Sequence, residues 1–291
     1  MYEKYFNKLK EECLIRNRKE ETLRTYTNHI KKFLNWTGNK QPEELTLEDA
    51  RNYIYELRVD KNRSTQHCNG INSALKFFYK HVLHKPWDSE AVPRMVNDVR
   101  LPEVTTLENI EKMIDTAREV RNKAIIALLY SSGLRVGELC RLAPGDIYMS
   151  TMQVHVRYEK NHQDHWTILS QKTLDLLTEY WRSNPLKREK LFVTLNAPYR
   201  PLKKSGVECM VRKIGREAGI GRVYPHLLRH SFASHMVEQG VPLEHIQSMM
   251  GHRDPYSTHR YIHVSNKALM GITSPLDHPH EKKRGREKKN G

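Results

Sequence analysis

The sequence contains no long hydrophobic run. None of its segments has the ~18 successive apolar residues that indicate a membrane-spanning helix. The first residues, Met1 to Phe6, include charged side chains in place of the apolar stretch of a signal peptide. We therefore expect a soluble, cytoplasmic protein that has no membrane partner.

Cysteine is scarce, and the cysteines that are present lie far apart. There are four: Cys13, Cys68, Cys140 and Cys209. They form no C-x-x-C pair, and no histidines stand around them at zinc-finger spacing. The chain also lacks a compact carboxylate cluster of the kind that holds Mg²⁺ in two-metal nucleases. These absences predict reduced thiols, no metal ion and no other cofactor.

Acidic residues are outnumbered by basic ones. The 291 residues include 49 Lys and Arg against 34 Asp and Glu, which gives a formal net charge of +15. Such an excess favours a polyanionic partner, because each phosphate that a basic side chain neutralises releases counterions from nucleic acid. Ribosomal and membrane-surface proteins are also basic, so charge alone indicates a nucleic-acid partner without establishing it.

Residues 1–84 are predicted to form a small helical bundle. Apolar residues recur at helical spacing in two segments: Leu23, Tyr26, Ile30, Phe33 and Leu34, and then Ile71, Ala74, Leu75, Phe78 and Val82. Thr46 begins an N-cap pattern for a helix between them. The polar faces carry seven basic residues that can meet phosphates or simply face solvent: Arg24, Lys31, Lys32, Arg51, Arg63, Lys76 and Lys80.

The helical periodicity fails over residues 85–104, which predicts an extended linker. Three prolines stand there among charged residues: Pro86, Pro93 and Pro102. Thr105 and Glu108 then match a capping box, with Thr105 as the N-cap of a new helix. We expect a second domain over residues 105–275, followed by a basic, disordered tail over residues 276–291.

The second domain is predicted to be mostly helical with one β-hairpin. Residues 124–130 are apolar on almost every side, as in a central helix, and Gly133 ends that helix. Apolar residues alternate with polar ones over 154–158, and a second strand follows at 166–170, so Lys160 lies near the tip of the hairpin. Further helices are predicted over residues 171–181, 205–218, 225–239 and 242–250.

Two segments of this domain carry arginines suited to holding a phosphate. Arg135 stands after Gly133 at a sharp junction between helices, where backbone N–H groups favour an anion. Glu138 is three residues further on and can orient the guanidinium of Arg135. His226 and Arg229 lie one turn apart at the start of a predicted helix, so both can reach one phosphate. Taken alone, each segment is also explained by ordinary surface residues.

In their order along the chain, these segments resemble the tyrosine recombinases, also called the phage integrase family. The family pattern is an Arg in a Gly-Leu-Arg-x-x-Glu-Leu turn, a hairpin Lys, a His-x-Leu-Arg-His helix, a Gly-His pair and a Tyr nine residues after that His. The matching residues are Arg135, Lys160, His226, Arg229, His252 and Tyr261. The hairpin departs from the family's Gly-Lys-Gly, but Lys160 is the one lysine in its turn.

The resemblance implies the fold class and the activity. The fold would be mainly α with a small β-sheet: a helical core-binding domain and an α+β catalytic domain that together clamp double-stranded DNA. The activity would be site-specific recombination, that is integration, excision or inversion, by a homotetramer assembled on two recombination sites. Tyr261 would form a 3′-phosphotyrosyl link without metal or ATP, and Lys160 would protonate the departing 5′ oxygen.

Two other functions are compatible with these residues. A type IB topoisomerase uses similar side chains but relaxes supercoils as a monomer. The spacing from Gly-His to Tyr and the chain length favour the recombinase. A non-catalytic DNA-binding protein could keep the fold, but the complete set of six catalytic residues argues against the loss of activity.

Overall fold

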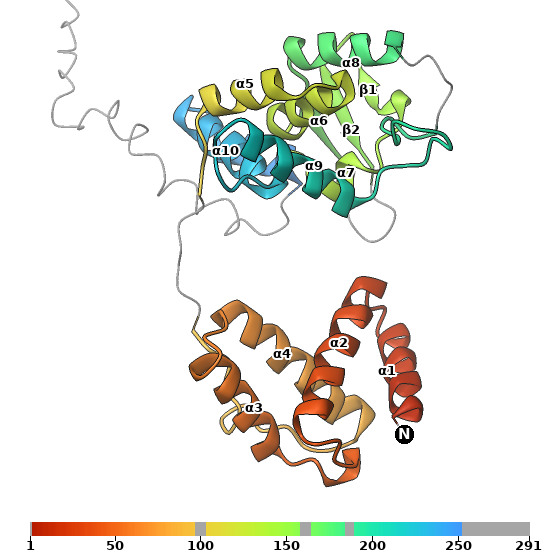
Figure 1. Cartoon of the computed structure of the whole chain (residues 1–291), viewed down its shortest axis with the longest axis vertical. Helices are drawn as coiled ribbons and strands as arrows, with labels where there is room; N and C mark the ends of the chain where they lie inside the picture. The colour runs from red at the N-terminus through yellow and green to blue at the C-terminus, as the bar shows by residue number, and fades with distance from the viewer. Residues whose placement is uncertain (1, 97–102, 158–163, 184–188, 252–291) are drawn as a thin grey trace, which may run out of the picture. The chain divides into compact units, whose positions relative to one another are not determined.

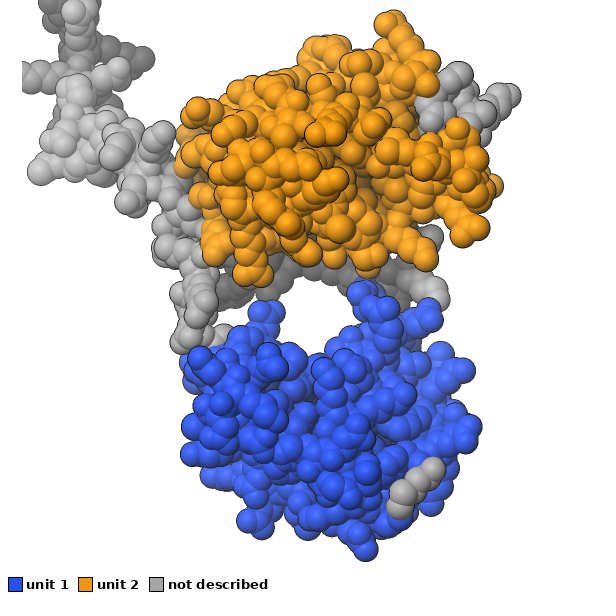
Figure 2. Space-filling view, viewed as in Figure 1, with its two compact units in different colours: residues 1–100 blue, residues 101–291 orange. Residues whose placement is uncertain are grey.

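The computed structural model describes residues 2–96, 103–157, 164–183 and 189–251. The chain divides into two compact units, which we call the amino-terminal unit, residues 1–100, and the carboxy-terminal unit, residues 101–291 (Figure 1; Figure 2). Helices dominate both units, and a small antiparallel sheet lies in the second, so the predicted fold class is confirmed. Among the described residues, no helix is both long enough and apolar enough to cross a membrane.

The amino-terminal unit is a helical bundle, as predicted. Its helices are α1 (Glu3–Ile15), α2 (Glu20–Trp36), α3 (Leu47–Val59) and α4 (Thr65–Phe77), with a 3-10 helix η1 (Pro42–Glu44) and a π-helical turn η2 (Phe78–Val82). The N-cap predicted at Thr46 is confirmed, because its hydroxyl accepts a hydrogen bond from the backbone N–H of Asp49 at 3.2 Å. The Asp49 carboxylate accepts one from the backbone N–H of Thr46 in return. Both ends of this capping box are therefore satisfied.

The segment that follows these helices belongs to the same core. Trp87 and Val92 are buried among the apolar side chains of the bundle. The side-chain amide of Asn69 donates to the carbonyl of Met95 and accepts from its N–H, both at 2.9 Å, and that of Asn72 donates to the carbonyl of Val92. The prediction of an extended linker from residue 85 is therefore wrong up to Met95, because irregular backbone is fixed here by burial and by side-chain amides.

The carboxy-terminal unit is built around one buried helix. Its helices are α5 (Leu107–Thr116), α6 (Val120–Ser131), α7 (Val136–Leu139), α8 (Gln171–Ser183), α9 (Lys204–Glu217), α10 (Pro225–Glu238) and α11 (Leu243–Met250), with a 3-10 helix η3 (Pro144–Asp146). Helix α6 is buried from Ala124 to Leu129 and packs against α5, α8 and α10. The prediction of a central apolar helix is confirmed.

Helix α5 begins one residue later than predicted. Thr106 is its N-cap, and the hydroxyl of Thr106 accepts the backbone N–H of Asn109 at 3.2 Å. Thr105 is buried, and its backbone N–H donates to the hydroxyl of Ser231 on α10 at 2.8 Å. The predicted capping box of Thr105 and Glu108 is therefore wrong, because a contact with α10 takes Thr105 out of the cap position.

The predicted hairpin is present in a three-stranded antiparallel sheet. Its strands are β1 (Ile147–Tyr148), β2 (Gln153–Val156) and β3 (His165–Ile168), in the order β1-β2-β3. Val156 pairs with His165 at the end of the hairpin next to its connecting segment, and both side chains are buried. Lys160 belongs to the segment that connects this pair, and it lies outside the described residues.

Candidate functional site

A sharp turn after α6 places Arg135. Gly133 has φ +60°, and a Cβ at this position would lie 2.4 Å from an atom of the Phe232 ring. Both the left-handed backbone and the contact with α10 therefore require glycine. The chain then turns so that Arg135 becomes the N-cap of the short helix α7. This turn brings the start of α7 next to α10, the helix that carries His226 and Arg229.

One buried carboxylate lies between the two arginines. Glu138 Oε1 accepts a hydrogen bond from Arg135 Nη1 at 2.7 Å, and Oε2 accepts the backbone N–H of Arg135 at 2.7 Å. Arg229 Nη1 lies 3.7 Å from Glu138 Oε2, and the side chain of Glu138 is only 1% exposed. A buried carboxylate needs charge partners, and here two guanidinium groups supply them. Glu138 therefore orients both arginines.

Backbone carbonyls hold the same two guanidinium groups. Arg229 Nη1 donates to the carbonyl of Gly133 and its Nη2 to the carbonyl of Met250, each at 2.6 Å. Arg135 Nη2 lies 3.5 Å from the carbonyl of Gly251, the residue that ends α11 in the left-handed conformation. The side chain of Arg135 is 33% exposed and that of Arg229 only 3%. Arg135 is therefore the more accessible of the two guanidinium groups, and Arg229 is the more firmly held.

His226 lies in the first turn of α10, on the exposed side. Its pKa is below the ordinary value for histidine, because neighbouring protein removes part of the hydration of the ring and because Arg229 and Arg135 repel a third positive charge. The imidazole is therefore neutral near pH 7 and can accept a proton. An anion bound at the arginines would raise this pKa again, since it favours the charged ring.

Three of the predicted site residues are thus brought together, and three fall outside the described part of the chain. Arg135 and Arg229 lie against Glu138, and His226 is near enough for the charges of all three to act on its pKa. Lys160, His252 and Tyr261 lie in segments that the structure does not describe, as does the basic tail. In the sequence, His252 directly follows Gly251, whose carbonyl lies close to Arg135.

One buried histidine beside the arginines was not predicted. His165, the first residue of β3, is 8% exposed, and its ring lies against Gly251. Its pKa is lowered, first by burial and then by the charges of Arg229 and Arg135, although Glu138 and Asp164 act in the opposite direction. It is one of 16 histidines, and its position in an alternating strand gives no sequence pattern that would distinguish it.

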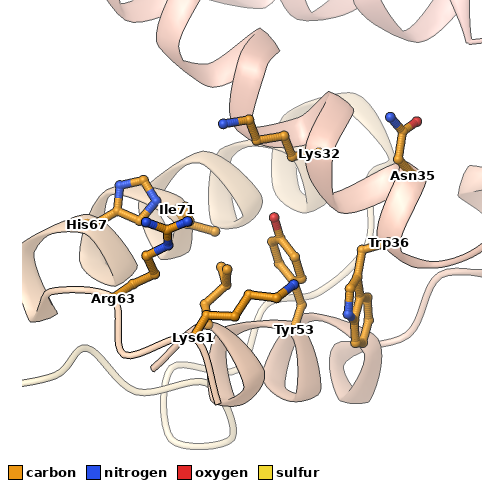
Figure 3. Close-up of a pocket in the computed structure, with 9 residues that line it drawn as sticks. Lys32, Asn35, Trp36, Tyr53, Lys61, Arg63, His67 and Ile71 are labelled. Carbon is orange, nitrogen blue, oxygen red and sulfur yellow. The ribbon is translucent and has the colours of Figure 1, made fainter. Parts of the chain in front are cut away.

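The amino-terminal unit has a separate basic pocket of about 540 Å³ between α2, α3 and α4 (Figure 3). Its lining includes four basic or titratable side chains and four aromatic or aliphatic ones: Lys32, Lys61, Arg63 and His67, and Trp36, Tyr53, Leu57 and Ile71. Lys61 pairs with Glu56 at 2.7 Å. The pKa of His67 is lowered, first by burial and then by Arg63 and Lys32. The pocket therefore has a positive electrostatic potential, which favours the binding of an anion.

The described residues contain no candidate metal centre. No group of three or more His, Cys, Asp or Glu side chains among them is arranged to hold a metal ion. The carboxy-terminal site is instead a set of positive donors around one carboxylate, which suits binding of a phosphate group directly.

Two sequence profiles match the chain. The profile of the Phage integrase family matches residues 103–268, more than half of the chain, and that of the Phage integrase N-terminal SAM-like domain matches residues 5–89. The first match includes Arg135, His226 and Arg229, and the second includes the basic pocket.

Named relatives align along nearly the whole chain. The tyrosine recombinase XerC of Staphylococcus haemolyticus is 30% identical over 295 residues, covering 96% of this chain and 97% of the relative. The tyrosine recombinase XerA of Pyrococcus furiosus is 32% identical over 259 residues, covering 88% of this chain and 87% of the relative. Among solved structures, XerA recombinase aligns at 28% identity with a TM-score of 0.54, covering 93% of this chain and 96% of that one. The structure of the Tn1549 transposon integrase in complex with transposon right-end DNA aligns with a TM-score of 0.71, covering 91% of this chain and 97% of that one. Its sequence identity is 16%, so this likeness concerns the fold alone.

Proposed function

The chain belongs to the phage integrase family and is a tyrosine site-specific recombinase, and we propose that it cuts and rejoins double-stranded DNA at a phosphate held by Arg135 and Arg229. The observation that carries this proposal is the pair of guanidinium groups held by one buried carboxylate, Glu138. A phosphodiester is negatively charged, so attack on it requires positive donors placed where charge develops on its oxygens. Guanidinium groups keep their charge at every physiological pH and can hold two oxygens at once.

The remaining family residues complete the reaction in this proposal. Tyr261 attacks the phosphorus, and its oxygen replaces the 5′ oxygen of the strand, which leaves a 3′-phosphotyrosyl link. His226, kept neutral by its surroundings, accepts the phenolic proton, and His252 donates a further hydrogen bond to the phosphate. Lys160 protonates the departing 5′ oxygen. The new link keeps the energy of the phosphodiester, so a 5′-hydroxyl can reseal the strand without ATP or a metal ion.

The test is a suicide DNA substrate that carries a nick near the cleavage site. We expect the protein to form a covalent complex joined to the 3′ phosphate, with the same yield in the presence of EDTA, because the arginines take the place of a metal ion. Denaturing electrophoresis detects the complex, and peptide mapping locates the attached residue. A 5′-phosphate link, or a yield that requires Mg²⁺, would contradict the mechanism.

A plasmid relaxation assay separates the recombinase from a type IB topoisomerase. A recombinase exchanges strands between paired sites, whereas a topoisomerase relaxes any supercoiled plasmid as a monomer. Plasmids with two recombination sites should therefore give recombinant products. Relaxation without strand exchange, once such sites are supplied, would favour the topoisomerase instead.

We assign the two units different tasks. The amino-terminal unit, whose core includes the segment up to Met95, would serve as the core-binding domain and residues 105–275 as the catalytic domain, with residues 276–291 as a basic tail. Exchange between two duplexes breaks four strands, so four protomers on two sites would supply one Tyr261 each. Of the structures that resemble this fold, that of XerH is bound to a palindromic difH substrate and that of lambda integrase to a COC′ core site. The proposed place of action is the cytoplasm, where an intracellular enzyme meets DNA.

The basic pocket of the amino-terminal unit is proposed to contact DNA phosphates. Replacing Lys32 and Arg63 with Gln should lower the affinity for duplex DNA about tenfold and reduce the slope of log affinity against log salt by about two, one for each lost phosphate contact. Fluorescence anisotropy at several salt concentrations measures both quantities. The double variant Lys10→Gln with Arg18→Gln, in which both exposed residues lie outside the pocket, is the matched control. Equal losses in the two double variants would show that only net charge matters.

A further inference from the structure

The ring of His165 packs against Gly251, in the turn that ends α11. A Cβ built on Gly251 would lie 2.8 Å from both Cε1 and Nδ1 of His165, which is closer than two such atoms normally approach. Gly251 also has φ +58°, a conformation that favours glycine. Strand β3 and helix α11 are therefore packed so closely here that the imidazole ring sets the position of the turn.

The same turn holds the two arginines. The carbonyl of Met250 accepts from Arg229 Nη2 at 2.6 Å, and the carbonyl of Gly251 lies 3.5 Å from Arg135 Nη2. A displacement of the turn would therefore move the acceptors of both guanidinium groups together. Misplacement of a reacting group by about 1 Å can reduce a rate by about 100-fold.

Charged groups from several elements face His165. Arg229 comes from α10, Arg135 from the turn before α7, and Glu138 from α7 itself, while Asp164 precedes it on the hairpin. Burial and the two arginines outweigh the two carboxylates, so the pKa of His165 lies below its ordinary value. A protonated ring would add a third positive charge beside Arg229 and would weaken the hold of Glu138 on the arginines.

We propose that His165 is a positioning residue of the recombination site: its ring supports the Met250–Gly251 turn and, through the carbonyls of that turn, orients Arg229 and Arg135. This inference rests on the proposed function, because it assigns the arginines to the phosphate. His165 does not touch DNA in this role. Since β3 is the strand that follows the segment with Lys160, His165 also ties the hairpin to the arginine pair.

Two variants of His165 test the proposal by cleavage. His165→Ala removes the support and should reduce the single-turnover cleavage rate about 10- to 100-fold at unchanged DNA affinity. His165→Gln fills a similar volume and stays neutral, so it should remain within about threefold of the natural protein. In His165→Gln the cleavage rate should also fall less steeply as the pH is lowered. Glutamine cannot be protonated, so only the protonation of His226 remains.

The matched control is His155→Ala on the neighbouring strand. His155 stacks on Trp166 and pairs with Asp164 at 3.3 Å, away from the arginines, so its replacement disturbs the hairpin without reaching the turn. A loss of cleavage as large as that of His165→Ala would show that hairpin stability, not positioning, is responsible. A His165→Gln variant as slow as His165→Ala, or with an unchanged pH profile, would overturn the proposal as well.

A measurement without DNA separates this proposal from the proposed function. The guanidinium protons of Arg229 are buried and bonded to two carbonyls, so NMR should show them exchanging slowly with water. In His165→Ala their exchange should accelerate at least about tenfold, and in His155→Ala it should not change. Unchanged exchange in His165→Ala overturns the positioning role, even if cleavage is lost. Accelerated exchange in a protein that cuts no DNA would support the role and contradict the function instead.

Discussion

Replacing Tyr261 with Phe is expected to abolish the covalent complex with DNA and to leave DNA affinity within about twofold of the natural protein. The substitution removes only the phenolic oxygen, so no atom remains that can attack the phosphorus. Loss of a nucleophile costs about four to six orders of magnitude in rate, which puts cleavage below detection. A nicked suicide substrate and denaturing electrophoresis measure the adduct, and anisotropy measures the affinity.

The control for this variant is Tyr256→Phe, five residues earlier in the same segment. It loses an equivalent hydroxyl but, in the proposed assignment, not the nucleophile, so its adduct yield should remain close to that of the natural protein. An adduct that persists in Tyr261→Phe and disappears in Tyr256→Phe would move the nucleophile to Tyr256. Loss in both variants would indicate that the segment is sensitive as a whole, and peptide mapping of the adduct would then decide.

Several helices of this protein could be predicted because they carry a periodic apolar face, and α6 could be predicted because it is apolar on almost every side. Their ends depend on contacts from elsewhere in the fold. Thr105 has a local sequence suited to an N-cap, yet its backbone N–H bonds to Ser231, which is 126 residues away, and Thr106 caps the helix instead. A cap preference of about 1 kcal/mol is small enough for one such contact to decide the position.

Burial of irregular backbone could not be predicted in the same way. Trp87 and Val92 lie among prolines and charges at no regular spacing, which is the pattern of a linker. In the fold they are buried in the amino-terminal core, and Asn69 and Asn72 on α4 satisfy the backbone of the segment. The buried amides of α4 matter only once the chain returns to them, so no local pattern reveals the contact.

The arginine site was accessible to sequence analysis only in part. The spacing of Arg135 and Glu138 predicted the contact that the structure shows at 2.7 Å. It did not predict that the same carboxylate also lies near Arg229, because 91 positions separate Glu138 and Arg229 in the sequence and the fold alone joins them. His165 lacked any local pattern, since its importance comes from contact with Gly251 in a different element.

Arg229 provides the sharpest test of the described part of the site, through the substitution Arg229→Lys. Lysine keeps the positive charge near Glu138 but has a single ammonium group in place of a planar fork, so it cannot reach the carbonyls of both Gly133 and Met250. Loss of donors to the developing charge should reduce the cleavage rate by about 100- to 1,000-fold. One carbonyl left without its buried donor should lower the free energy of unfolding by about 1 to 3 kcal/mol.

Single-turnover cleavage and urea unfolding measure these two effects of Arg229→Lys, and Arg118→Lys, at an exposed position between α5 and α6, is the matched control. DNA affinity should change by less than about threefold, because the side chain of Arg229 is only 3% exposed and most counterion release comes from accessible basic groups. Slow cleavage at nearly unchanged DNA affinity would show that Arg229 stabilises the transition state of cleavage and contributes little to the binding of DNA. Cleavage at the natural rate would instead show that charge alone suffices, and the two carbonyl contacts would then serve only the fold.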